Sequence, residues 1–484
     1  MRQLIFKSLM AMCAISSPAI ASSHALALPS EKNVTAKAAP TKVTHPEWSR
    51  DAVIYEVNWR QMTPEGTIAA VEKQIPRLKE LGVDILWVMP VNPISKEGRK
   101  GELGSYYASA DYKALNPELG TMDDFRHFVK TAHDNGMKVI IDWVPNHTGN
   151  DNWWLEYHPD FYKRDASGEP VHPYEWTDVS QLDYSNPQMR RYMIDAMAHW
   201  LCDADIDGFR CDVASMVPVD FWNEARPQLE AVKPGLFMLA EASSPDLQAE
   251  GFDMGYNWPM ASLFKAIANN AGQYTMPDDP GKKEAVAIDS LLASQQAEYP
   301  GDTYLMNMIT NHDFNSWEGT EFQRFGNLAD AMAVLTYTLP GMPLIYTGQE
   351  TGLNRALEFF KKDDAPLFEP RNSYFEFYQK LNALKHSQKA LRAGAPGTQG
   401  GHIVRYPTKS QDLYIFSRQL DGSEVLVMTN LGSKTRKIKY QGEAPLANDM
   451  INYFTGKHEK YPSSLKPGEY RVYIRPKYTS NKPM

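Results

Sequence analysis

The feature that most constrains the fold is an alternation between short apolar runs and longer amphipathic stretches, sustained over about 340 residues. The runs are rich in β-branched residues, which is typical of buried strands, whereas stretches such as 121–135 repeat apolar residues at helical spacing. Predicted strands that alternate with predicted helices favour a parallel sheet. Because the number of predicted strands is near eight, a closed (β/α)8 barrel of TIM type is favoured. The clearest strand runs are 53–57, 85–89, 139–142, 208–212, 237–241, 306–309 and 343–346.

Two departures from this alternation predict further domains. After the third run, residues 148–182 show neither helical nor strand periodicity, are rich in Trp, Tyr, His, Pro and Asp, and predict a small inserted domain. From residue 393 the pattern becomes a two-residue alternation with turn residues between, which predicts a C-terminal antiparallel β domain over 393–484. The barrel is then expected to comprise residues 47–147 and 183–392.

The first residues have the pattern of an export signal. Arg2 and Lys7 precede or flank an apolar stretch, and Ala19-Ile20-Ala21 gives a small-x-small cleavage site, so residues 1–21 predict a signal peptide. The stretch is shorter than the ~20 residues of a membrane span, so no span is expected after cleavage. Residues 22–46 have almost no large apolar side chain and predict a flexible leader. An exported protein, periplasmic or extracellular, is the expected result.

Composition narrows the class of ligand. With 50 Lys and Arg against 59 Asp and Glu, the formal charge is −9, which argues against a nucleic-acid partner. Aromatic residues make up 11% of the chain, enough to line a groove for an uncharged ligand as well as the core.

Polar and acidic residues end several of the predicted strands, where (β/α)8 barrels carry their chemistry. A single acidic residue at a strand end is as often structural as functional. Several acidic residues in one cleft raise one another's pKa and indicate a functional site. These strand-end residues are Asp142, Asn146, His147, Arg210, Asp212, Glu241, His312 and Asp313.

Glycoside hydrolysis is the chemistry that needs such a cluster, because one carboxylate attacks the anomeric carbon while another donates a proton. Strand alternation puts Arg210 and Asp212 on one face and Cys211 on the other. We expect Arg210 to keep Asp212 ionised as the nucleophile by depressing its pKa. Glu241 is then the acid and base with a raised pKa, and Asp313 stabilises the positive transition state.

These residues also carry a resemblance to a known family. Residues 142–147, 208–212, 239–241 and 311–313 resemble the four ordered sequence regions of the alpha-amylase family of glycoside hydrolases, family 13. The likeness covers about residues 51–350, and the terminal β domain and the insertion are similar to the family's domains C and B. Further matching segments are 105–108, 111–117, 120–121 and 346–350.

The resemblance implies the same three roles for the acids and adds contacts to the sugar. It implies that Tyr107 stacks under the sugar being cleaved, that His147 and His312 bond its hydroxyls, and that Arg210 contacts the nucleophile. The protein is thus similar to a secreted alpha-amylase or a maltodextrin-acting relative, with an α-glucan or maltooligosaccharide as substrate. Retaining hydrolysis of mainly α-1,4 bonds is the expected reaction.

Some positions depart from the family pattern. Ser215 and Met216 stand where many starch-acting members have Lys-His, and Val213 follows the nucleophile, where relatives with Val tend to accept α-1,6 bonds. Action on short oligosaccharides as an α-glucosidase, transglycosylation, and a non-catalytic sugar-binding role therefore stay open. Trp153 and Trp154 could stack sugars or pack in the interior.

Calcium is the one cofactor in question. Asn146 sits where calcium-binding members supply an oxygen ligand, and Asp178 or Asp183 could complete a site. Gln181, however, stands near where several members place an Asp. We expect that no cofactor is required and that any calcium dependence is weak.

Overall fold

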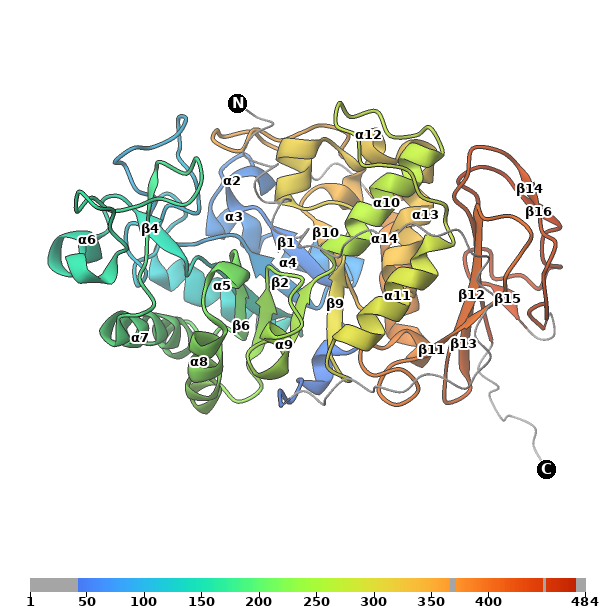
Figure 1. The fold of residues 1–484 in the computed structure, drawn as a ribbon, viewed down its shortest axis with the longest axis horizontal. Coiled ribbons are helices and arrows are strands. Elements are labelled where there is room, and N and C mark those ends of the chain that lie inside the picture. The colour runs from blue at the N-terminus through green and yellow to red at the C-terminus, as the bar shows by residue number, and fades with distance from the viewer. Residues whose placement is uncertain (1–41, 366–370, 447–449, 476–484) are drawn as a thin grey trace.

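The computed structural model describes residues 42–365, 371–446 and 450–475 (Figure 1). In this part of the chain eight parallel strands close into a barrel in the order β1, β2, β3, β6, β7, β8, β9 and β10. The predicted (β/α)8 barrel is therefore confirmed. The barrel strands are β1 Ile54–Val57, β2 Ile85–Val88, β3 Lys138–Trp143, β6 Gly208–Cys211, β7 Phe237–Ala240, β8 Met254–Tyr256, β9 Tyr304–Asn307 and β10 Met342–Tyr346.

Alternate side chains of each strand enter two different cores. On β1, Ile54 packs in the cluster inside the barrel, whereas Tyr55 and Val57 pack in the larger cluster under the helices. On β6, Phe209 and Cys211 face the helices, as the two-residue period predicted. Inward polar residues near the ends of the strands therefore point to the mouth of the barrel.

Helices surround the barrel, and their ends follow the sequence signals. The stretch predicted over 121–135 is α5 Met122–Asp134, which begins at a capping box between Thr121 and Asp124. In the described ranges no helix combines the length and apolarity needed to cross a membrane. The other α-helices are α2 Trp59–Met62, α3 Ile68–Glu72, α4 Ile75–Leu81, α6 Trp153–Tyr157, α7 Pro187–Asp203, α8 Val219–Val232, α9 Leu247–Glu250, α10 Trp258–Asn270, α11 Ala287–Glu298, α12 Glu321–Phe325, α13 Ala329–Thr338 and α14 Ser373–Ser387.

Strand β8 is the one that the apolar runs did not predict. It is only three residues long and contains a glycine and no β-branched residue. The preceding Asp253 is fully buried and accepts hydrogen bonds from the backbone N–H of Met238 at 2.8 Å and from Arg226 Nη1 at 2.7 Å. Contacts to β7 and α8, rather than strand propensity, therefore place β8.

The predicted signal peptide, 1–21, and most of the predicted leader lie outside the described residues. The end of the leader is not flexible as expected, because residues 42–46 pack on the barrel. The N–H of Lys42 donates to the carbonyl of Ala249 at 2.8 Å, and His45 Nδ1 lies 3.0 Å from Asp253 Oδ1 with both side chains fully buried. Specific polar partners order this segment, and its composition could not show them.

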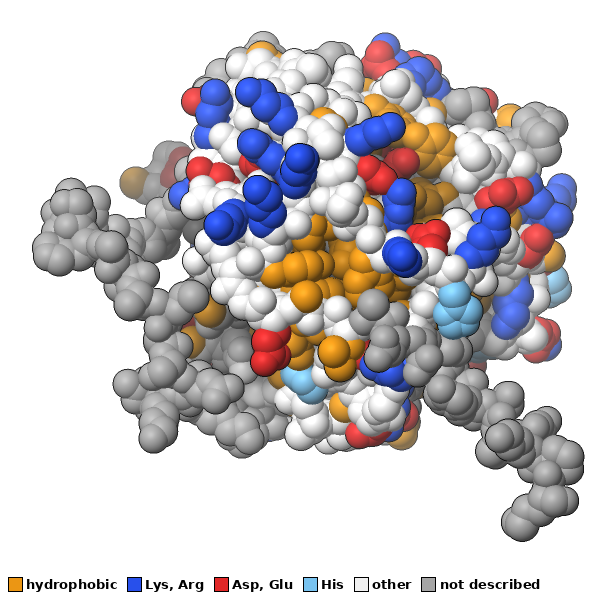
Figure 2. Space-filling model, turned by 90° about the vertical axis from the view of Figure 1, so that its right-hand side faces the viewer, with side chains coloured by type: hydrophobic (Ala, Val, Ile, Leu, Met, Phe, Trp, Pro, Cys, Tyr) orange, Lys and Arg blue, Asp and Glu red, His pale blue; other side chains and the backbone are white. Residues whose placement is uncertain are grey.

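Two smaller β units flank the barrel. In the insertion, β4 His147–Gly149 pairs antiparallel with β5 Val179–Gln181. In the C-terminal β domain, one sheet has the order β11-β12-β13-β17-β15, and β14 pairs with β16. Figure 2 shows hydrophobic side chains at the centre of this domain's outer face, with Lys and Arg around them. The strands are β11 His402–Arg405, β12 Leu413–Leu420, β13 Ser423–Asn430, β14 Arg436–Lys437, β15 Ile451–Asn452, β16 Ser464–Leu465 and β17 Tyr470–Ile474.

Candidate active site

One buried arginine gathers three carboxylates at the mouth of the barrel. Arg210 of β6 is opposite Asp142 of β3 in the strand register, and its Nη1 donates to Asp142 Oδ1 at 2.7 Å. The same nitrogen lies 3.1 Å from Asp212 Oδ1, and Nη2 lies 3.0 Å from Glu241 Oε2. Tyr256 of β8 accepts from Arg210 Nε at 3.1 Å. The structure thus brings together Arg210, Asp212 and Glu241, as the strand ends predicted.

The acids hold protons more tightly than free carboxyl groups. Burial raises the pKa of Asp212 well above its usual range, the charge of Glu241 raises it further, and Arg210 lowers it. Burial also raises the pKa of Glu241, and it raises the pKa of Asp142 to about 6 against the effect of Arg210. Arg210 does lower the pKa of Asp212, as expected, but burial and the charge of Glu241 outweigh it. The expectation of a depressed pKa for Asp212 is therefore wrong.

Glu241 is fixed by a strained backbone position. The N–H of Val213 donates to Glu241 Oε2 at 2.7 Å. Val213 has φ 37° and ψ 45°, a left-handed conformation that is unfavourable for a β-branched residue. Because Oε2 also faces Arg210, a proton on this carboxyl group belongs on Oε1, the oxygen free to meet a ligand.

His312 and Asp313 enter the mouth from the loop after β9. His312 Nε2 lies 2.9 Å from the hydroxyl of Tyr107 and 3.3 Å from Asp313 Oδ1. The Tyr107 hydroxyl donates in turn to Asp142 Oδ2 at 3.0 Å, and the rings of Tyr107 and His312 stack with centroids 5.5 Å apart. The predicted tyrosine, histidine and acid therefore form one network with the carboxylate cluster.

Glu56 is a site residue that the sequence analysis missed. This inward residue of β1 is fully buried, and its Oε1 lies 2.5 Å from His312 Nδ1. Burial lowers the pKa of His312, but the charges of Asp313 and Glu56 raise it, and it comes to about 9. The signal for Glu56 was an acid at an inward position of the apolar run 53–57. His312 is therefore held as an imidazolium at neutral pH.

His147 lies in a different environment. It begins β4, it is buried beside the Trp176 ring with centroids 5.5 Å apart, and it is hydrogen-bonded to the backbone of Tyr107. Burial lowers the pKa of His147 to about 4, so this ring is neutral. The site thus presents one charged and one neutral imidazole.

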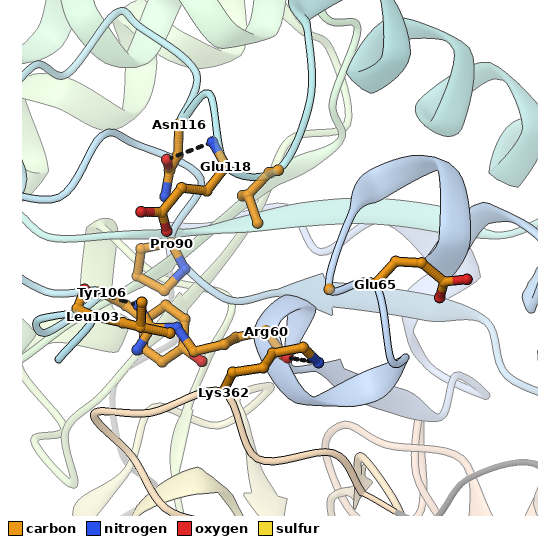
Figure 3. A pocket seen from close by; sticks show the side chains of 10 residues that line it. Arg60, Glu65, Pro90, Leu103, Tyr106, Asn116, Glu118 and Lys362 are labelled. Carbon is orange, nitrogen blue, oxygen red and sulfur yellow. Dashed lines mark hydrogen bonds between the residues drawn. The ribbon is translucent and has the colours of Figure 1, made fainter.

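A polar pocket behind Tyr106 supports the loop that carries Tyr107 (Figure 3). The Arg60 guanidinium lies 4.0 Å from the centroid of the Tyr106 ring, and it donates to the carbonyls of Gly104 and Phe359, each at 3.1 Å. Lys362 Nζ donates to the carbonyl of Arg60 at 2.7 Å. The hydrogen bonds of these lining residues therefore connect the loops after β1, β2 and β10.

The residues around Asn146 do not fit a calcium ion. Asn146 Oδ1, the expected ligand atom, accepts a hydrogen bond from Gln181 Nε2 at 3.3 Å. Asp178 Oδ1 pairs with Lys100 Nζ at 3.0 Å, and Asp183 Oδ1 accepts from the backbone N–H of Ser185 at 3.0 Å. An amide donor and an ammonium group thus face the oxygens that a hard cation would need.

A (β/α)8 barrel with this carboxylate cluster at its mouth defines an enzyme of the glycoside hydrolase class. The family profile described as the catalytic domain of alpha-amylase matches residues 41–179 and 172–367. The chain therefore belongs to the alpha-amylase family.

Relatives and solved structures agree with this assignment. Alpha-amylase MalA of Haloarcula japonica is 28% identical over 411 residues, which cover 80% of this chain and 56% of that protein. A cyclomaltodextrinase of Thermoanaerobacter pseudethanolicus is 24% identical, with 81% of this chain and 72% of that protein covered. The crystal structure of an alpha-amylase from Lactobacillus plantarum has a TM-score of 0.76 at 29% identity, covering 88% of this chain and 99% of that one. The chain thus spans little more than half the length of the Haloarcula relative.

The Glu56–His312 pair gives a prediction that does not depend on the reaction. In Glu56→Gln, the pKa of His312 should fall from about 9 by about one unit or more, because a negative charge at 2.5 Å is replaced by a neutral amide. The protonated ring then contributes less stability, a contribution present below pH ~6.5 and lost as pH rises through the folded-state pKa. NMR titration of the imidazole measures the shift.

Glu350→Gln is the matched control, since Glu350 is also fully buried but bonds Tyr55 and Arg77 outside the mouth. An unchanged His312 titration in Glu56→Gln would contradict the assignment of Glu56.

Proposed function

We propose that the protein hydrolyses α-glucosidic bonds, mainly α-1,4, in starch, maltodextrin or related α-glucans, with retention of anomeric configuration. The observation that carries this proposal is the cluster of Asp142, Asp212 and Glu241 on the one guanidinium of Arg210. A buried carboxyl pair with raised pKa values supplies both the attacking group and the proton that such hydrolysis needs.

The roles of the acids follow from their surroundings. Asp212 Oδ1 faces Arg210, so Asp212 attacks the anomeric carbon when Glu241 carries the shared proton. Glu241 gives that proton to the leaving oxygen from Oε1, because Oε2 is occupied by the Val213 N–H, and later accepts a proton from water. Asp313, beside the charged His312, opposes the positive charge of the transition state.

Three side chains are suited to hold the sugar next to Asp212. The Tyr107 ring supplies a flat apolar face, and the imidazolium of His312 supplies a charged donor. The neutral ring of His147 bonds a hydroxyl group without adding charge to the cluster. Glu56 positions His312 and does not itself touch the sugar.

We further propose that the protein is exported, periplasmic or extracellular. The support is the signal pattern of residues 1–21. A relative in Bacillus subtilis is named an intracellular maltogenic amylase, so the proposal rests on this chain's own first residues. Calcium is not required in this proposal, because Gln181 and Lys100 use the oxygens of Asn146 and Asp178.

Product analysis tests the reaction. Incubation with starch, pullulan, maltotriose and isomaltose should release products from the α-1,4 substrates, and NMR should show the α-anomer first, because two inversions retain configuration. Cleavage of isomaltose, or release of maltotriose from pullulan, at a comparable rate would indicate α-1,6 activity. Cleavage of pullulan by itself would not, because pullulan contains both α-1,4 and α-1,6 bonds. A β-anomer as the first product would contradict retention.

The two central acids should respond differently to an activated substrate. Glu241→Gln should still react with an aryl glucoside that has a good leaving group and be rescued by azide, because the first step then needs no proton. Asp212→Asn should lose that step by orders of magnitude. Steady-state rates with and without azide measure both variants, and equal inactivity of the two would reverse the assignment.

Thermal melting tests the calcium proposal. A chelator should leave the melting temperature and the activity unchanged, because a ligand that is not bound adds no stability. Gln181→Glu is the matched variant: it replaces the amide donor facing Asn146 by a carboxylate of equal length, so its melting temperature should rise with added Ca²⁺. Loss of wild-type activity on chelation, restored by Ca²⁺, would contradict the proposal.

A further inference from the structure

Two aromatic side chains on the short helix α6 remain exposed in the inserted domain. Trp153 is 40% exposed and Tyr157 is 67% exposed, and their ring centroids lie 6.4 Å apart, one helical turn along α6. Within the described ranges the other large hydrophobic side chains that stay exposed are the aliphatic Val232 and Leu446. Exposed single aliphatic residues are ordinary, whereas a pair of exposed aromatic rings is a candidate binding surface.

The neighbouring tryptophan explains why α6 presents this face. Trp154 is only 3% exposed and packs between Tyr112, Phe161 and Tyr192, with ring centroids 5.0, 5.6 and 5.9 Å away. Of the two roles open for the tryptophan pair, Trp154 therefore takes the packing role. It holds α6 so that Trp153 stays at the surface.

A small pocket, lined by both aromatic and charged side chains, lies directly beside Trp153. Its wall includes Asp111 and Lys113 from the loop before α5, and Tyr192 and Asp195 from α7. Lys113 Nζ and Asp195 Oδ2 are 2.5 Å apart, with 45% and 71% of their side chains exposed. An aromatic wall with donors and acceptors at its rim is suited to stack a sugar ring and bond its hydroxyl groups.

This surface is separate from the mouth of the barrel. Trp143 of β3 points outward, donating from Nε1 to Met193 Sδ of α7 at 3.2 Å, and the Tyr112 ring packs between Trp143 and Trp154. In Figure 1, α6 lies at the end of the molecule opposite the C-terminal β domain. The pocket thus opens on the outer flank, beyond a layer of buried aromatic rings.

We propose that Trp153, Tyr157 and the adjoining pocket bind an α-glucan chain at a second site on the outer flank of the inserted domain. The identity of this ligand rests on the proposed function. A glucan polymer that is the substrate at the mouth of the barrel is long enough to bind at the outer flank at the same time. Two linked contacts on one polymer raise its overall affinity without changing how a short oligosaccharide binds at the mouth.

The experiment compares polymer binding with short-substrate activity. The double variant Trp153→Ala/Tyr157→Ala should be retained about tenfold less by amylopectin in a native affinity gel. Its kcat/KM on a short maltooligosaccharide should stay unchanged. Val232→Ala is the control for loss of an exposed apolar side chain, since Val232 is 42% exposed on α8, and it should behave as wild type. Trp153→Phe keeps a flat ring and should recover part of the retention.

Each other outcome has a defined meaning. Unchanged retention in the double variant, or an equal loss in Val232→Ala, would overturn the second site. Unchanged retention together with loss of a dimer in sedimentation would also overturn the second site, because the patch would then be a protein interface. If the wild type cleaves no α-glucan but its retention still depends on Trp153, the second site stands and the proposed hydrolysis fails.

Discussion

The site depends on burying one guanidinium among carboxylates inside a closed barrel. Arg210 is fully buried, bonds Asp142 and faces Asp212 and Glu241, and its charge also lies over the ring of Trp87, 5.0 Å from the centroid. Removal of the guanidinium would leave the carboxylates uncompensated in a low-dielectric interior, which costs about 3–5 kcal/mol. This cost explains why the mouth is lined by a rigid polar network.

The network has more negative than positive groups, and that imbalance is chemically useful. Arg210 and the imidazolium of His312 face Glu56, Asp142, Asp212, Glu241 and Asp313. Asp142, Asp212 and Glu241 therefore hold protons more tightly than free carboxyl groups, and they exchange protons as a group. A retained proton next to an ionised carboxylate is the condition for acid catalysis and nucleophilic attack at one site.

The barrel also separates chemistry from the contacts that surround it. Glu56 hydrogen-bonds His312 to β1, and the residues of the Arg60–Tyr106 pocket connect the Tyr107 loop to neighbouring loops. The side chains of Tyr107 and His312 are therefore held in place at the mouth. Strand β4 begins at His147, within the mouth, and the inserted domain that follows carries the aromatic surface of α6 on its outer side. One short insertion thus contributes both to the mouth and to the outer flank.

The amino-acid sequence by itself determined the barrel, because the inward and outward alternation of runs such as 208–212 is set by strand geometry and needs no distant partner. It also placed Asp212, Glu241 and Asp313 at strand ends or in the loop that follows. Only the tertiary structure determined that β8 forms and that His45 is packed against Asp253. It also determined the roles of Glu56 and Gln181, because each of these features depends on a partner far away in the chain. It also reversed the expected pKa of Asp212, since burial and shared charge act only after folding.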